Sequence, residues 1–204
     1  SRRYTAYLAA IDRLVVEHAP RDAGALLDVG AADGHRALCI AKALGIASVV
    51  LVEPAASMAE ACRDQDAAEV WEVTAQTLPV HTGRFDLVTC LWNVLGHVPD
   101  DAARGEALRR MAASLSSRGR LIVDVHHRYN AAAYGWWATL GRMAYDLAFP
   151  RTANGDVVAH FRVDGRDIPC AGHVFTRREM LRLFRHADLV VERRFVVHAT
   201  TGSL

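Results

Sequence analysis

Short apolar runs alternate with segments of helical spacing along most of the chain. The runs are rich in Val, Ile and Leu and predict strands over residues 25–29, 48–53, 69–73, 84–91, 119–125 and 189–197. Between them, apolar residues recur every three or four positions, which predicts helices over residues 5–19, 32–45, 57–68, 100–115 and 176–187. Strands that are apolar throughout are buried on both faces. The alternation therefore predicts an α/β fold with a mostly parallel sheet between layers of helices.

Residues 129–172 interrupt this alternation with a segment rich in aromatic side chains. Within it, residues 157–174 resemble two strands around an Asp164-Gly165 pair, which is a strong signal for a β-hairpin. We interpret residues 129–172 as an insertion in a single domain that spans residues 1–204. Parallel sheets bind ligands at the carboxyl ends of their strands, so we expect the insertion to act as a lid over that edge.

Composition and charge limit the kinds of molecule that the chain is expected to bind. The net charge of the 204 residues is +1, so neither nucleic acid nor an anionic membrane surface is an expected partner. No apolar run is long enough to span a bilayer. The four cysteines lie far apart without a C-x-x-C pair, so we expect free thiols in a cytoplasmic environment. No histidine pair has i,i+4 spacing, and no metal site is predicted.

The turn after the first predicted strand carries the clearest candidate chemistry. Residues 28–34 read DVGAADG, and their glycines let the backbone turn sharply and approach a ligand closely. The helix that follows presents free N–H groups at the same place. A dinucleotide site requires the pattern G-x-G-x-x-G, but Ala32 and His35 stand where glycines are needed. That class of site is therefore excluded.

This turn resembles the first motif of class I S-adenosylmethionine-dependent methyltransferases, which is acid-x-Gly-x-Gly-x-Gly. Ala32 takes the place of the middle glycine. The resemblance continues to residue 197 with the motifs in the family's order, and it implies a Rossmann-like fold with a seven-stranded sheet. It also implies S-adenosylmethionine as the cofactor and S-adenosylhomocysteine as the product. The cofactor contacts implied by this motif are Asp28, Gly30, Ala31 and Gly34.

Two further motifs concern the adenosine part of that cofactor. Glu53 ends the second predicted strand, where a family carboxylate accepts both ribose hydroxyls. Pro54 and Met58 would contact the adenine. After the third strand, many relatives have the pattern Asp-Ala-Glu-x-Leu-Pro, whose Asp binds the adenine amino group. The corresponding residues in this chain are Thr74, Ala75 and Gln76.

The run FDLVTCLWNVLGHVPDD, residues 85–101, resembles the family's fourth motif. In the family, carbonyl groups at this strand end meet the methionine amine of the cofactor. The resemblance implies that Leu91, Trp92 and Asn93 line this end. Asn93 and His97 would then face the reactive methyl group and contact the acceptor.

The fifth predicted strand ends in DVHHRYN, a stretch similar to one in glycine and other small-amine N-methyltransferases. This similarity implies that the polar side chains after the strand project toward the acceptor, with Arg128 binding an acceptor carboxylate. Trp136 of the insertion would complete the pocket. The acceptor contacts predicted from this region are His126, His127, Arg128, Tyr129 and Trp136.

Together these motifs predict methyl transfer to the nitrogen or oxygen of a small molecule by in-line displacement, with positioning supplying much of the rate. A base is needed only if the bound nucleophile carries a proton, and His97 and His126 are the candidates. Two alternatives stay open. One is a nucleic-acid methyltransferase, and the other is a non-catalytic methyltransferase-like binding protein, which the departures at Ala32 and Thr74 motivate. The sequence leaves the acceptor and the oligomeric state open.

Overall fold

The fold follows the predicted alternation in most of its elements. The computed structural model describes residues 4–65, 69–163 and 166–204. In chain order the elements are α1 (Thr5–His18), β1 (Ala25–Val29), α2 (His35–Leu44), β2 (Ser48–Val52), α3 (Ala56–Arg63), β3 (Glu69–Trp71), η2 (Ala75–Thr77), β4 (Phe85–Cys90), α4 (Val94–His97), α5 (Asp101–Ser114), β5 (Leu115–Val123), α6 (Ala131–Tyr134), α7 (Trp136–Ala148), η3 (Thr152–Gly155), β6 (Asp156–Val163), β7 (Arg166–His173) and α8 (Arg177–His186).

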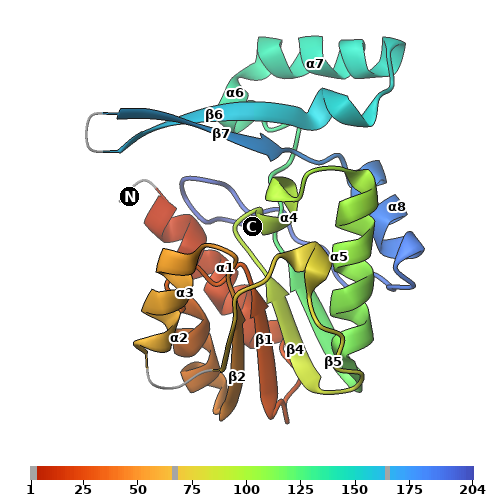
Figure 1. Cartoon of the computed structure of the whole chain (residues 1–204). Helices are drawn as coiled ribbons and strands as arrows, with labels where there is room; N and C mark the ends of the chain where they lie inside the picture. The colour runs from red at the N-terminus through yellow and green to blue at the C-terminus, as the bar shows by residue number, and fades with distance from the viewer. Residues whose placement is uncertain (1–3, 66–68, 164–165) are drawn as a thin grey trace.

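Five strands form one parallel sheet in the order β3-β2-β1-β4-β5 (Figure 1). β1 lies at the centre, where Leu27 pairs with Val50 of β2 and with Val88 of β4. Because these strands run in the same direction, their carboxyl ends meet at one edge of the sheet. Most of the residues predicted to bind ligands lie at or just after these strand ends in the sequence.

Alternate strand residues face two separate hydrophobic cores. Leu26 and Leu87 belong to a core built with α1 and α2 on one face of the sheet. Leu27 and Val88 belong to the core built with α5 and α8 on the other face. This period of two explains why the strands are apolar throughout, since each strand buries both of its faces.

The predicted seven-stranded sheet is wrong, because the parallel sheet has five strands and β6 and β7 form a separate antiparallel pair. Residues 189–197, predicted as a strand, are not one in the structure. A strand needs hydrogen-bonded neighbours, and none of the described residues pairs with this segment as a strand. Val190 and Val196 are 88% and 76% exposed, while Phe195 stacks on His18 of α1 at 4.8 Å between ring centroids.

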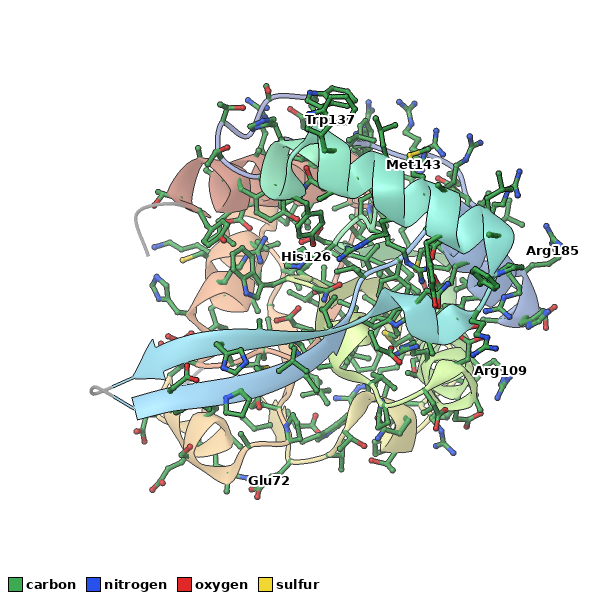
Figure 2. The ribbon with its side chains drawn as sticks, turned by 90° about the horizontal axis from the view of Figure 1, so that it is seen from above. Glu72, Arg109, His126, Trp137, Met143 and Arg185 are labelled. Carbon is green, nitrogen blue, oxygen red and sulfur yellow. The ribbon has the colours of Figure 1, made fainter. Side chains whose placement is uncertain are left out.

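Residues 131–163 and 166–173 form a layer above the carboxyl edge of the sheet. This layer contains α6, α7 and the β6–β7 hairpin, and the two views agree on its position (Figure 1; Figure 2). The predicted pair of strands within residues 157–174 is confirmed, whereas the predicted Asp164-Gly165 turn lies outside the described residues. At the base of the hairpin, β7 contacts α4. None of the helices described is long and apolar enough to cross a membrane.

Candidate functional site

The turn after β1 brings the backbone to the carboxyl edge of the sheet. Gly30 has a φ of +83° and Gly34 a φ of +77°, which glycine adopts without strain. A Cβ on Gly30 would lie 2.3 Å from the Val94 side chain of α4, so the turn requires a residue without one. Ala32, which replaces the middle glycine of the motif, also has a positive φ of +52°. The turn therefore keeps a glycine-like backbone at the altered position.

Asp28 supports this turn from inside the protein. The residue is 8% exposed, and its Oδ1 accepts the Thr89 hydroxyl at 2.6 Å. Burial raises the pKa of Asp28 to about 6, against the opposing effect of the Thr89 hydrogen bond. Ala31 is also buried, and its N–H donates to the Val52 carbonyl. Both residues are thus buried and make hydrogen bonds within the chain.

Glu53 joins the loops that follow β1 and β2. Its Oε2 accepts the N–H of Ala32, and its Oε1 accepts the N–H of Ala55, both at 3.0 Å. A carboxylate offers about four lone-pair positions, so each oxygen of Glu53 can accept one more donor. The side chain therefore retains acceptor capacity at the carboxyl end of β2.

A cleft of about 270 Å³ opens beside the turn. Five of the predicted cofactor contacts line it: Gly30, Pro54, Thr74, Ala75 and Gln76. Its other lining residues are Val29, Val52, Val73, Val94, His97, Val98 and Pro99. Met58 lies on α3 outside this lining and is 45% exposed. Apolar walls with a few polar groups suit a flat heterocycle such as adenine, so the residues present fit an adenosine-containing cofactor.

The chain after β4 has an unusual backbone that Asp124 fixes. Trp92 and Asn93 have φ values of +58° and +59°, which residues other than glycine rarely adopt. The Asp124 Oδ2 accepts the Trp92 N–H at 3.0 Å, and the Asp124 carbonyl accepts the Asn93 N–H at 3.1 Å. Its Oδ1 accepts the Tyr7 hydroxyl of α1 at 2.5 Å. Sequence reasoning missed Asp124 and Tyr7, although Asp124 stands near the end of a predicted strand.

Asn93 is turned into the protein, in contrast to the prediction that it faces the reactive methyl group. It is 5% exposed, and its Nδ2 donates to the His173 carbonyl at 3.1 Å. Its Oδ1 accepts the His126 N–H at 3.0 Å. Leu91 is buried as well, whereas Trp92 is 37% exposed. Asn93 therefore ties the ends of β4, β5 and β7 together.

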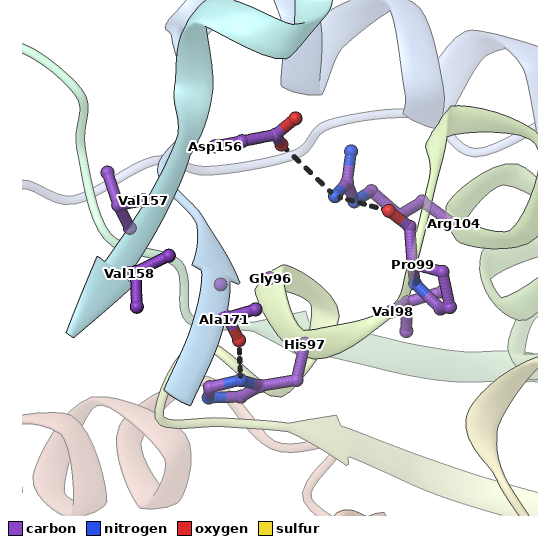
Figure 3. Close-up of a pocket in the computed structure, with 10 residues that line it drawn as sticks. Gly96, His97, Val98, Pro99, Arg104, Asp156, Val157, Val158 and Ala171 are labelled. Carbon is purple, nitrogen blue, oxygen red and sulfur yellow. Dashed lines mark hydrogen bonds and ion pairs between the residues drawn. The ribbon is translucent and has the colours of Figure 1, made fainter. Parts of the chain in front are cut away.

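A second cavity of about 340 Å³ lies between the hairpin and the loop that joins α4 to α5 (Figure 3). It shares His97, Val98 and Pro99 with the cleft, so the two spaces adjoin at α4. Its other lining residues are Gly96, Arg104, Asp156, Val157, Val158, Ala171 and Gly172. Sequence reasoning missed Arg104 and Asp156, the charged residues of this lining.

His97 lines both spaces, and its hydrogen bond fixes its tautomer. The Nδ1 atom lies 3.1 Å from the Ala171 carbonyl oxygen (Figure 3). A carbonyl can only accept, so Nδ1 carries the proton in the neutral ring and Nε2 carries the lone pair. At His126, burial lowers the pKa, against the opposing effect of Asp124, and so favours the neutral ring. Of the two histidines predicted as bases, His126 therefore has a pKa shifted toward the neutral form, and His97 presents Nε2 as the ring nitrogen with a free lone pair.

Arg128 lies inside the structure and is not available to an acceptor. It is 4% exposed and binds the carboxylates of Asp146 and Glu179 at 3.2 and 2.9 Å. It also donates to the carbonyls of Val174 and Thr152. Because these partners already satisfy the guanidinium, the predicted contact between Arg128 and an acceptor carboxylate is wrong.

The other residues predicted from this region lie outside the lining of both cavities. Tyr129 donates its hydroxyl to Asp146 at 2.7 Å and so belongs to the Arg128 network. His127 is exposed, and its Nδ1 accepts the Tyr129 N–H. Trp136, on α7, is 73% exposed. Among the side chains described, no group of three His, Cys, Asp or Glu is placed to hold a metal ion.

Comparisons with known proteins agree with this architecture. The family described as "Methyltransferase domain" matches residues 1–193, and no curated protein matches the chain in sequence. A SAM-dependent methyltransferase from Methanosarcina mazei is 19% identical, with a TM-score of 0.66 over 85% of this chain and 82% of that chain. DesVI from Streptomyces venezuelae is 18% identical, with a TM-score of 0.67 over 99% and 89% of the two chains.

A third similar structure is CalS10 from Micromonospora echinaspora, an amino pentose methyltransferase solved with SAM bound. It is 21% identical, with a TM-score of 0.58 over 88% of this chain and 80% of that chain. At such identities these likenesses show a common fold, while the family match extends over 193 of the 204 residues. The chain belongs to the methyltransferase domain family and is a class I S-adenosylmethionine-dependent methyltransferase with S-adenosylmethionine as its cofactor.

Proposed function

We propose that the protein methylates the nitrogen or oxygen of a small molecule held in the cavity under the hairpin. The observation that carries this proposal is that the cavity adjoins the cleft at His97, so an acceptor and a cofactor would meet there. A pocket of about 340 Å³ is in the range of small-molecule sites. CalS10 is an amino pentose methyltransferase of the same fold, which supports a small acceptor.

In this proposal the cleft holds the cofactor, which supplies an electrophilic methyl group when bound. Gly30 would let the backbone approach it closely, and Glu53 would accept the ribose hydroxyls with its remaining lone pairs. Ala75 and Gln76 of η2, which line the cleft, would contact the adenine. The hairpin lies over the carboxyl edge of the sheet (Figure 1) and would limit the access of water to the reacting atoms.

His97 would act as the base for an acceptor that binds in its protonated form. The Ala171 carbonyl keeps the proton on Nδ1, which leaves Nε2 to take the acceptor proton. His97→Asn retains a donor for Ala171 but removes Nε2. We expect this variant to lower kcat by about 100-fold or more while its affinity for S-adenosylhomocysteine changes little. An unchanged kcat would show that His97 moves no proton.

Methyl transfer from S-adenosylmethionine with a labelled methyl group tests the acceptor class. The purified protein is incubated with a small-metabolite extract and, separately, with total RNA. We expect label in the small-molecule fraction only. Label in RNA alone would support the nucleic-acid alternative, and binding of S-adenosylhomocysteine without transfer to either fraction would support a non-catalytic binding protein.

A further inference from the structure

Arg104 is a buried cation whose hydrogen-bonding capacity is mostly unused. It lies on α5, is 3% exposed and lines the cavity under the hairpin (Figure 3). Its Nη2 donates to the Pro99 carbonyl at 3.3 Å, and among the described residues its Nε has no hydrogen-bond partner. A buried guanidinium with unsatisfied donors is costly, so such a group needs an explanation.

The carboxylates near Arg104 do not satisfy it. Asp156 Oδ1 is 3.9 Å from Nη2, and Asp101 Oδ1 is 4.0 Å from Nη1, both beyond hydrogen-bond range. Asp156 Oδ1 binds His173 at 2.7 Å and Asp101 Oδ2 binds Arg182, while Asp101 Oδ1 has no hydrogen-bond partner among the described residues. Burial lowers the pKa of Arg104, against the opposing charges of Asp156, Asp101 and two further carboxylates.

Arg128 provides a comparison within the same molecule. It is buried to the same degree, at 4% exposure, but it binds two carboxylates and two backbone carbonyls of neighbouring segments. Among the described residues, one buried arginine thus makes four hydrogen bonds, and the other makes one at the wall of a cavity with two carboxylates outside hydrogen-bond range. This difference indicates that Arg104 receives its acceptor from outside the chain.

We propose that Arg104 binds an anionic group of the acceptor, a carboxylate or a phosphate, and so orients the acceptor in the cavity. The proposal rests on the proposed function, since it assigns a chemical class to the acceptor of that site. A guanidinium is suited to either group, because its planar array of donors matches two anionic oxygens. Val98, Val157 and Val158 supply apolar walls for the rest of the acceptor.

The side-chain Nε–H signals of arginine in an NMR spectrum report on this site directly. The full-length protein, saturated with S-adenosylhomocysteine, is titrated with butyrate, butyl phosphate and the neutral butyramide at constant ionic strength. Arg104→Met identifies the Arg104 signal and removes its donors, while Arg104→Lys keeps the charge. Arg109→Met is the matched control, because Arg109 lies on the same helix, 51% exposed at its side chain and paired with Glu106.

We expect butyrate, butyl phosphate or both to shift the Arg104 signal saturably, and butyramide to leave it unchanged. The affinity for the effective anion should fall about tenfold or more in Arg104→Met and stay the same in Arg109→Met. Arg104→Lys should bind the anion with intermediate affinity. Whichever anion binds more tightly identifies the group on the acceptor.

The proposal fails if neither anion shifts the Arg104 signal, or if Arg104→Met binds them as tightly as the unmodified protein. Calorimetry with S-adenosylhomocysteine on the same variants measures cofactor binding. It therefore distinguishes a failure of the Arg104 proposal from a failure of the proposed function. Retained cofactor binding without anion binding would overturn the Arg104 proposal alone. A protein that does not bind S-adenosylhomocysteine would contradict the proposed function, and the anion titration of the ligand-free chain would still test Arg104.

Discussion

Replacing each of two buried arginines, Arg128 and Arg104, should lower the free energy of unfolding by different amounts. Arg128→Met leaves Asp146 and Glu179 buried without their cation, so we expect the free energy of unfolding to fall by about 3 kcal/mol or more. Arg104→Met removes a cation with few partners and replaces it with an apolar side chain, so the change should stay within about 1 kcal/mol. Urea unfolding of both variants measures this difference. Equal losses would contradict the distinction between the two residues.

Asp28 should make the stability of the protein depend on pH in a definite direction. Its pKa is about 6 in the folded chain, against an ordinary value of 3.8, so folding is favoured where the carboxyl is protonated. This contribution is full below about pH 4 and is lost as the pH rises through 6. The Asp28→Asn variant has no carboxyl group to titrate at this position, so it does not lose this contribution. Its free energy of unfolding, minus that of the unmodified protein, should therefore rise by about 3 kcal/mol between about pH 4 and pH 7. A difference that is constant with pH would contradict this prediction.

At the scale of elements, the helices and strands that carry a local signal could be predicted from the sequence. Thr176 and Glu179 form the capping box of α8, with a hydrogen bond in each direction at 3.2 and 3.3 Å. The predicted strand over residues 189–197 shows where a local sequence pattern fails to predict an element. Its apolar pattern is compatible with a strand, but a strand also requires a paired neighbour, which no local pattern encodes.

The contact between α4 and β7 lies beside both cavities and depends on Gly96. A Cβ there would lie 2.3 Å from the Asn93 Nδ2 and 2.5 Å from the His173 carbonyl oxygen. Gly96→Ala should therefore destabilise the protein by about 1–3 kcal/mol and displace His97. Gly141→Ala, on α7 where a Cβ meets nothing within 4 Å, should instead stabilise it by about 0.5–1 kcal/mol. Thermal unfolding of both variants tests the pair, and destabilisation of equal size would contradict the steric argument.

At the scale of the whole molecule, the two halves of the candidate site differ in how far the sequence could predict them. Gly30 and the residues from Thr74 to Gln76 line the cleft because they follow strands whose ends must meet at one edge. Arg104 lies in the run DAARGEALRR, whose charges are typical of an exposed helix face. It lines the cavity under the hairpin only because α5 and the hairpin, which are distant in sequence, pack together around it.

Cofactor binding at the cleft should stabilise the whole fold, because the cleft is built from several strand ends and from α4. S-adenosylhomocysteine at about 100 times its dissociation constant should raise the free energy of unfolding by about 2.7 kcal/mol. For a chain of 204 residues this corresponds to an increase in Tm of about 5–10 °C. Each further tenfold increase in ligand should add about 1.4 kcal/mol. NAD at the same concentrations is the matched control, since Ala32 and His35 break the dinucleotide pattern and no shift is expected. A shift with NAD as large as that with S-adenosylhomocysteine would show that the cleft recognises adenosine alone, whichever group is attached to the ribose.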